Sequence, residues 1–160
     1  MRYAACLVGL LLGLAAAGQA GGTEESTAFG FWLNPDQGWV VETSACGAAL
    51  CGKLVGFRQT QSPDYVAIDR HNPDPKKRSR PLCGLVLLGS FTPSPKVAGK
   101  WDHGWVYDPD TGKTYSGEAQ MIGSDTIELR GYILFPLFGR TLTLVRETGR
   151  ITRCSVSPPG

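Results

Sequence analysis

The chain of 160 residues is long enough for one domain with a buried core, and 42% of its residues are hydrophobic. Its 16 Lys and Arg residues nearly balance its 14 Asp and Glu residues, so the formal net charge is only +2. Proteins that bind nucleic acids usually carry a strong basic patch, and this balance gives no reason to expect such a partner.

Residues 1–20 have the pattern of a secretory signal peptide. Arg2 supplies the basic start, residues 4–17 are apolar, and Gly18 and Ala20 are small residues that suit cleavage after Ala20. A membrane anchor is the alternative, but the apolar run is shorter than the roughly 20 residues that a helix needs to cross a bilayer. We therefore expect an exported protein, and no later stretch predicts a membrane span.

The cysteines predict disulfide bonds. Loss of Cys6 with the leader leaves Cys46, Cys51, Cys83 and Cys154, an even number for an oxidising compartment. Cys46 and Cys51 suit a bridge across a tight hairpin corner, and Cys83 then pairs with Cys154 by elimination. A zinc site is the alternative, but C-x4-C followed by isolated cysteines is poor zinc-ribbon spacing, so no metal is expected.

Beyond the leader, residues 21–28 are small and polar and predict a loose N-terminal arm. The domain follows at residues 29–150, and residues 151–160 form a C-terminal tail. Alternating apolar residues between turn signals predict short strands at residues 29–33, 38–44, 50–57, 85–91, 99–107, 114–121, 126–132 and 139–146. No stretch after the leader has the pattern of a long amphipathic helix.

The longest interruption is the stretch at residues 71–84, HNPDPKKRSRPLCG. Asp74 can cap free amides and Pro75 suits a first helical position, so a single helical turn is expected there. If the protein has a functional loop, this basic stretch is the first candidate.

Two interpretations of this stretch remain open. It could act as a lid or as an anion contact through Arg78 and Arg80, with Asn72 and Ser79 adding hydrogen bonds. Alternatively, the two arginines hold the loop to the rest of the domain.

Short strands at near-even spacing, joined mostly by hairpin turns, indicate an all-β antiparallel meander. Closing such a meander into a barrel would remove exposed strand edges, which otherwise promote aggregation. An open sandwich is the alternative, because the number of strands does not report closure.

Three blocks of sequence together resemble one family: CGAALCGKLV, NPDPKKRSRPLCGL, and YDPDTGKTYSG followed by LRGYILFPLFGRTLT. They resemble the DUF2147 family of uncharacterised exported bacterial proteins, over residues 31–146. The resemblance implies a lipocalin-like, up-and-down antiparallel barrel of about eight strands in the periplasm, with secretion as the alternative. Cys83 departs from the family pattern, in which an aliphatic residue is more usual. The family has no established activity, so the resemblance implies no catalytic residues.

Gly30-Phe31-Trp32 also resembles the G-x-W opening of lipocalin first strands, in which the Trp closes the barrel base beneath an Arg from the last strand. Arg146 stands where that partner is expected. A guanidinium over an indole ring is a favourable contact. We therefore expect Trp32 and Arg146 to be structural.

Catalytic patterns are absent from the sequence: it has no G-x-S-x-G, H-E-x-x-H or S-x-x-K motif with its partners. His71 lies in the polar loop, and alternation places His103 on one strand face with Trp101, Trp105 and Tyr107. The pair Asp108 and Asp110 is explained by a turn. We expect no catalytic residue and no cofactor.

A binding barrel needs small residues facing inward, so that side chains do not fill the interior. Glycines on several strands supply them, beside candidate pocket residues that are mainly apolar: Leu54, Trp101, Trp105, Tyr115, Met121, Ile127 and Leu129. The leading hypothesis is a monomeric or weakly dimeric barrel that binds a small hydrophobic or amphipathic ligand without transforming it. The rival is an envelope interaction protein with a filled barrel whose loops dock a partner protein, and an enzyme of unknown reaction is the third.

Overall fold

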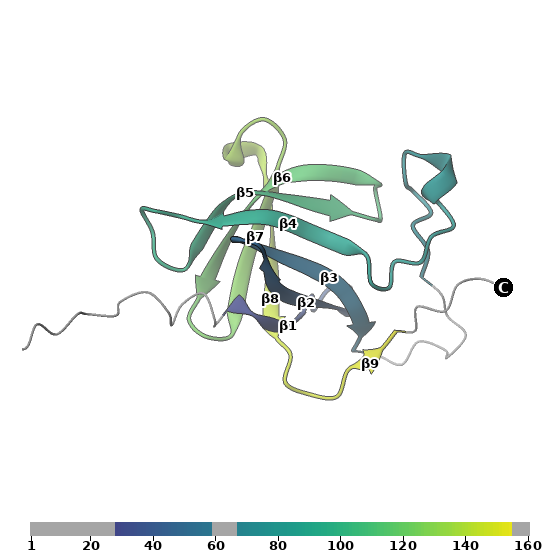
Figure 1. Cartoon of the computed structure of the whole chain (residues 1–160), viewed down its shortest axis with the longest axis horizontal. Helices are drawn as coiled ribbons and strands as arrows, with labels where there is room; N and C mark the ends of the chain where they lie inside the picture. Colours follow the sequence, from purple (N-terminus) through teal and green to yellow (C-terminus); the bar gives the residue numbers. More distant parts are fainter. Residues whose placement is uncertain (1–27, 59–66, 155–160) are drawn as a thin grey trace, which may run out of the picture.

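The structure, a computed structural model, describes residues 28–58 and 67–154 (Figure 1). The predicted signal peptide, residues 21–27 of the predicted arm and the last six residues of the tail lie outside the described residues. The fold consists of strands and two 3₁₀ turns, η1 (Pro75–Lys77) and η2 (Pro136–Phe138). The helical turn expected in the basic stretch is η1, in which the side chain of Asp74 accepts a hydrogen bond from the amide of Lys76.

Each predicted strand is present, within two residues of its expected ends. The strands are β1 (Gly30–Leu33), β2 (Trp39–Cys46), β3 (Ala49–Phe57), β4 (Val86–Pro93), β5 (Lys100–Asp108), β6 (Lys113–Ile122), β7 (Thr126–Tyr132), β8 (Arg140–Arg146) and β9 (Thr152–Arg153). Strand β9 was not predicted, because a two-residue strand has no alternation to detect.

The strands form one closed antiparallel barrel. Their order is β2-β1-β8-β7-β6-β5-β4-β3, and pairing between β2 and β3 closes the ring. The first and last strands of the ring, β1 and β8, meet at a short seam, where Trp32 pairs with Arg146 and Leu33 with Val145. The expected all-β, lipocalin-like, up-and-down barrel is confirmed, and the open-sandwich alternative is wrong because the first and last strands of the ring pair.

The antiparallel ring gives the barrel two different ends. We call the end that carries the β1–β2, β3–β4, β5–β6 and β7–β8 connections the open end. The other end, which carries the remaining turns together with Trp32 and Arg146, is the closed end. Near the closed end the interior is filled by the ring of Phe91, which is fully buried. Gly104 and Gly117 make room for it, since a Cβ atom on either glycine would lie within 2.8 Å of that ring.

A bulge in β5 corrects the expected alternation of its aromatic residues. His103 has a φ of 61°, and the register shifts between Trp101 and Gly104. Trp101 pairs with Ala119 and Gly104 with Gly117, so these two positions face inward. Trp105 therefore faces outward, where its ring covers Gly89, and Tyr107 faces outward with it.

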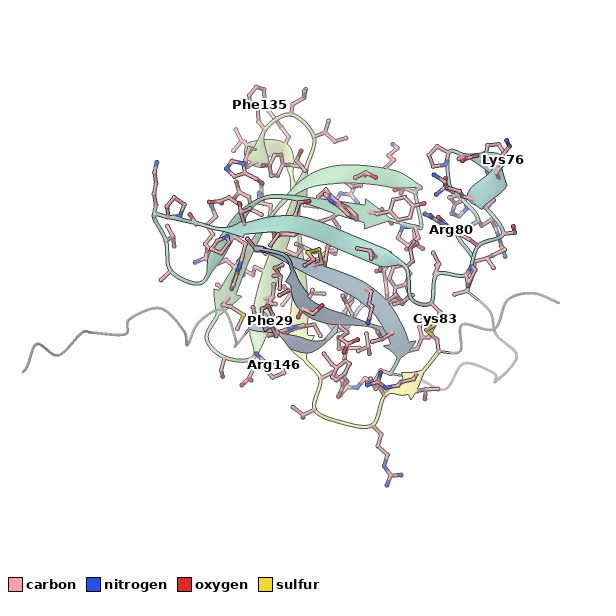
Figure 2. All side chains as sticks on the ribbon, in the orientation of Figure 1. Phe29, Lys76, Arg80, Cys83, Phe135 and Arg146 are labelled. Atoms are coloured by element: carbon pink, nitrogen blue, oxygen red, sulfur yellow. A yellow bond between two sulfur atoms is a disulfide. The ribbon has the colours of Figure 1, made fainter. Side chains whose placement is uncertain are left out.

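Both predicted disulfides are present, with Cα atoms 5.8 Å apart in Cys46–Cys51 and 5.9 Å apart in Cys83–Cys154. The zinc alternative is wrong, because all four thiols form these bonds. Cys46–Cys51 staples the β2–β3 hairpin. Cys83–Cys154 ties the basic stretch to the end of β9, which pairs with β3 (Figure 2). Residues 152–154 of the predicted tail are thus fixed to the barrel.

Candidate functional site

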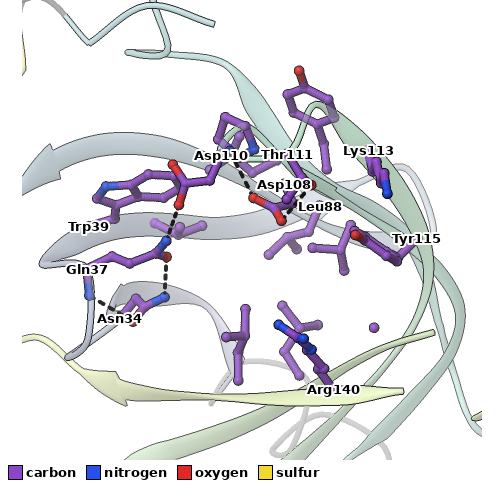
Figure 3. A pocket seen from close by; sticks show the side chains of 18 of the residues that line it. Asn34, Gln37, Trp39, Leu88, Asp108, Asp110, Thr111, Lys113, Tyr115 and Arg140 are labelled. Atoms are coloured by element: carbon purple, nitrogen blue, oxygen red, sulfur yellow. Dashed lines mark hydrogen bonds between the residues drawn. The ribbon is translucent and has the colours of Figure 1, made fainter. Parts of the chain in front are cut away.

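A cavity of about 790 Å³ opens at the open end of the barrel (Figure 3). Its deep wall is aliphatic and comes from residues of five strands: Val41, Leu87, Leu88, Val106, Leu129, Leu142 and Leu144. Cross-strand pairing explains part of this wall, because Val106 pairs with both Leu88 and Tyr115, and Leu129 pairs with Leu142. Alternation on neighbouring strands therefore gathers apolar side chains at one depth.

Gly131 of β7 also lines the cavity. A Cβ atom added there would meet only the side chain of Tyr115, at 3.6 Å, which is ordinary van der Waals contact. The contrast with Gly104 and Gly117 is direct, because their missing side chains are replaced by Phe91. Space beside Gly131 is left open.

The mouth of the cavity is polar. Asn34 donates a hydrogen bond to Gln37 (2.9 Å), and Gln37 in turn donates one to Asp110. Asp108 accepts hydrogen bonds from the amide of Asp110 (2.9 Å) and from the hydroxyl of Thr111 (2.8 Å), which fixes the β5–β6 turn. One lip of the mouth is therefore a rigid, hydrogen-bonded acidic turn.

The opposite lip carries positive charge. Arg140 projects from β8 across the cavity from Asp108 and Asp110 (Figure 3), whereas Lys113 of β6 pairs with Asp108 and lies on the acidic lip. Burial raises the pKa of Asp110 and the charge of Asp108 raises it further, whereas His71 and the bond from Gln37 lower it. The mouth thus has Asp108, Asp110 and Lys113 on one side and the guanidinium of Arg140 on the other.

The closed end is sealed by Trp32. Its indole N–H donates to the hydroxyl of Thr43 (2.9 Å) and to the carbonyl of Ala28 (3.0 Å), so its polar atom is satisfied while the ring is fully buried. The guanidinium of Arg146 lies 4.2 Å from the centre of the indole ring and donates to the carbonyls of Ser124 and Phe29. Ala28, expected to belong to a loose arm, is buried here.

A sequence model described as "uncharacterized protein conserved in bacteria (DUF2147)" matches residues 30–146. The chain belongs to the DUF2147 family. The match begins at the first residue of β1 and ends at the last residue of β8, so the family unit coincides with the closed ring.

Among solved structures, this DUF2147 barrel is similar to a protein from the human pathogen Helicobacter pylori that is described as belonging to the lipocalin family. The two chains are 22% identical with a TM-score of 0.61, and the likeness covers 69% of this chain and 73% of the other. At this identity the likeness shows a shared lipocalin-like fold. No curated protein matches the chain.

Of the candidate pocket residues, Tyr115 and Leu129 line the cavity of this DUF2147 barrel. The other five do not, namely Leu54, Trp101, Trp105, Met121 and Ile127. Trp101, Met121 and Ile127 lie deeper, on the closed-end side of Gly104 and Gly117, where the barrel is packed. Trp105 is excluded by the β5 bulge, and Leu54 is fully buried in the core.

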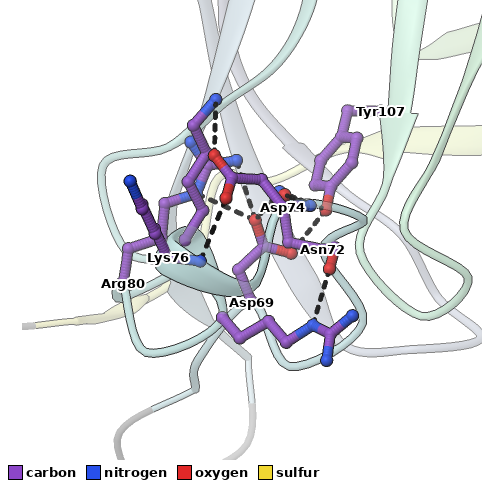
Figure 4. A network of polar contacts seen from close by, with 8 residues as sticks. Asp69, Asn72, Asp74, Lys76, Arg80 and Tyr107 are labelled. Carbon is purple, nitrogen blue, oxygen red and sulfur yellow. Dashed lines mark hydrogen bonds and ion pairs between the residues drawn. The ribbon is translucent and has the colours of Figure 1, made fainter.

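The 67–85 segment is held by a buried polar network beside the cavity (Figure 4). Its centre is the fully buried carboxylate of Asp69. Arg80 reaches this carboxylate with two nitrogens (2.8 and 2.7 Å), and Tyr107 and Asn72 also donate to it. Burial by itself would raise the pKa of Asp69, but these donors and the charge of Arg80 hold it below its ordinary value.

This network bears on the two interpretations of the basic stretch. Arg78 donates to the carbonyl of Asn72 (2.8 Å), and Arg80 is committed to Asp69, so both arginines hold the loop to itself and to Tyr107. Ser79 is exposed. None of the four predicted loop residues lines the cavity, so the geometry favours the holding role over the anion contact. Sequence reasoning missed Asp69 and Tyr107, because only the bulge turns Tyr107 outward toward the loop.

In the described ranges, no helix is long and apolar enough to cross a membrane, and no three His, Cys, Asp or Glu side chains gather as metal ligands would.

Proposed function

We propose that this barrel binds a small amphipathic molecule in the open-end cavity and does not transform it. The observation that carries the proposal is the cavity itself. Its volume of about 790 Å³ falls within the roughly 300–1,000 Å³ typical of small-molecule sites. Aliphatic depth with a few polar groups at the mouth is the usual composition of such a site.

The chemistry of the wall defines the ligand class. Apolar surface moved from water into the aliphatic depth contributes about 25 cal/mol per Å². The depth carries no charged side chain, so the buried part of the ligand should be hydrocarbon or aromatic. The mouth has Asp108 and Asp110 on one lip and Arg140 on the other, which suits a polar head that stays near water.

The rival hypothesis required a barrel filled by its own aromatic residues. Filling by Phe91 and Trp101 is found toward the closed end, whereas the open-end half keeps its cavity. For the enzyme hypothesis, the positions of the histidines give no support. His71 and His103 are both exposed, and neither lines the cavity.

The location is proposed on separate grounds. Two disulfides fit a protein exported to an oxidising compartment. With the predicted leader, they support a periplasmic protein. We propose that it acts there as a monomer or weak dimer.

The test fills the cavity without disturbing the fold. In Gly131→Phe the new ring would enter the space beside Tyr115, whereas Gly131→Ala adds a methyl group that fits at 3.6 Å. Titration with the apolar fluorophore N-phenyl-1-naphthylamine should show one site in the wild type and in Gly131→Ala. Gly131→Phe should weaken it about tenfold or more, since losing one well-buried apolar contact of 1.5 kcal/mol changes affinity by that factor.

Circular dichroism and thermal melting of the two variants serve as the folding control. If Gly131→Phe is folded and binds the fluorophore as tightly as Gly131→Ala does, the proposed site is wrong. Failure of the wild type to bind any apolar probe would reject the proposal as a whole.

A further inference from the structure

An apolar lobe protrudes from the open end. It consists of residues 133–138 of the β7–β8 connection, and Figure 2 shows Phe135 at its tip, pointing away from the barrel. All five of its large apolar side chains are more than half exposed: Ile133, Leu134, Phe135, Leu137 and Phe138. An exposed apolar surface concentrated in one loop marks an interaction site.

The backbone of the lobe satisfies many of its own polar groups. The amides of Phe135, Phe138 and Gly139 donate to carbonyls within the lobe. Arg130 donates from its side chain to the carbonyls of Pro136 (2.7 Å) and Leu137 (3.3 Å). Pro136 itself has no N–H to satisfy. A backbone group that is already paired loses no hydrogen bond to water when the lobe enters a less polar phase, so this pairing lowers the cost of shallow insertion.

The conformation at Leu134 supports the same conclusion. Leu134 has a φ of 69°, a region that Gly or Asn adopts at lower cost than a leucine does. Its side chain is 83% exposed, so packing inside the protein does not repay the strain. Strained residues retained on a surface often serve a binding role.

Two arginines lie at the base of the lobe. Arg130 holds it from β7, and Arg140 is the first residue of β8, across the cavity mouth from the acidic β5–β6 turn. Ile133 and Phe138 belong both to the lobe and to the cavity wall. Whatever surface receives the lobe will therefore face the mouth of the cavity.

We propose that the lobe inserts into the interface of an anionic lipid membrane and sets the open end of the barrel against it. Stable association with a bilayer from one side usually combines buried apolar side chains with basic residues that attract anionic headgroups, and both are present here. A stable protein interface typically engages about 20–30 residues on each side, far more than this lobe offers. This docking surface stands whether or not the cavity holds a ligand.

Co-sedimentation with vesicles tests the docking. The protein is mixed with vesicles of phosphatidylethanolamine and phosphatidylglycerol, or of phosphatidylcholine alone. The wild type should bind the anionic vesicles, and less strongly at high salt because exposed charges are screened. Leu134→Asn, which suits the positive φ and so should keep the fold, should weaken binding about tenfold.

A matched control removes an exposed aliphatic residue at the closed end. Val97, 44% exposed in the β4–β5 turn, becomes Asn, and this variant should bind vesicles as the wild type does. Gly131→Phe should also keep vesicle binding, so a failed cavity proposal leaves the docking proposal intact.

Three results would overturn the inference. One is a wild type that binds neither kind of vesicle. Another is equal vesicle binding by Leu134→Asn and the wild type, both folded. The third is sedimentation velocity that shows a wild-type dimer dissociated by Leu134→Asn, because the lobe would then receive a second copy of the chain.

Discussion

The two halves of the barrel share the same strands but differ in how their interiors are filled. Toward the closed end, Trp32, Phe91 and Trp101 are almost completely buried and occupy the space between the strands. Toward the open end, the lining is mostly aliphatic, with Tyr115 beside Gly131, and leaves a cavity of about 790 Å³. The closed ring is common to both halves, so side-chain size at each depth decides where the barrel is packed and where it can bind.

The glycines sharpen this contrast, because their role depends on their depth. Gly104 and Gly117 are required by a neighbour, since the ring of Phe91 occupies the positions their side chains would take. Gly131 has no such neighbour within close contact. A glycine that faces inward therefore shows an open interior only where no aromatic ring covers it.

Removing a buried ring from the packed half should lower the stability far more than removing a side chain from the cavity wall. Phe91→Ala should lower the free energy of unfolding by about 3–5 kcal/mol, because it leaves a cavity in a packed interior. Leu142→Ala, at the cavity wall and 39% exposed, should cost less than about 1 kcal/mol. Urea unfolding of both variants checks the difference, and equal losses would mean that the halves are packed alike.

The disulfide that closes the longer loop should contribute more to the stability of the fold. Replacing Cys83 and Cys154 together by Ser opens a loop of 71 residues, which the chain-entropy model values at about 4 kcal/mol. Replacing Cys46 and Cys51 opens a loop of five, worth about 2 kcal/mol. Thermal unfolding of the two double variants tests this order, and a larger loss at the closed-end hairpin would refute it.

The network that holds the 67–85 segment should make stability depend on acid. The pKa of Asp69 is lower in the folded protein, so its contribution is present above its unfolded value of about 4 and is lost as pH falls through the folded pKa. Asp69→Asn should cost about 2 kcal/mol at neutral pH, because Arg80 loses its ionic partner.

Melting temperatures at neutral pH and near pH 3 test this linkage. The gap between wild type and Asp69→Asn should narrow at the lower pH. A gap that stays constant would show that ionised Asp69 does not contribute to the stability of the fold.

The smallest effect tests the glycines directly. Gly104→Ala should destabilise the protein by at least about 1 kcal/mol, because the added methyl group would overlap Phe91. Gly131→Ala should be neutral or stabilising by about 0.5 kcal/mol, since it restricts the unfolded chain without a clash. Differential scanning calorimetry resolves both, and a destabilised Gly131→Ala would indicate a filled open-end interior.

Much of the fold could be predicted from the sequence, because alternation and turn residues mark each strand of the ring. Trp32 and Arg146 were expected to meet, and they pair directly between β1 and β8. A first strand of only four residues leaves few ways to align it with the last strand. Both disulfides followed from an even count of cysteines and one hairpin corner.

The cavity was harder to predict. A bulge at a non-glycine residue, His103, reverses the faces of β5 and cannot be inferred from alternation. Trp105 was therefore expected inside and lies outside. Depth along the barrel also depends on register between strands, which is why Met121 and Ile127 face inward yet lie away from the cavity.

The proposed role of the open-end half of the barrel is to hold a small amphipathic molecule. The most direct measurement is native mass spectrometry of the wild type and of Gly131→Phe, each purified without denaturation, followed by denaturing extraction. The wild type should carry a small molecule that denaturation releases, and Gly131→Phe should have the mass of the bare protein. A bare wild type, or the same molecule on both proteins, would contradict this role.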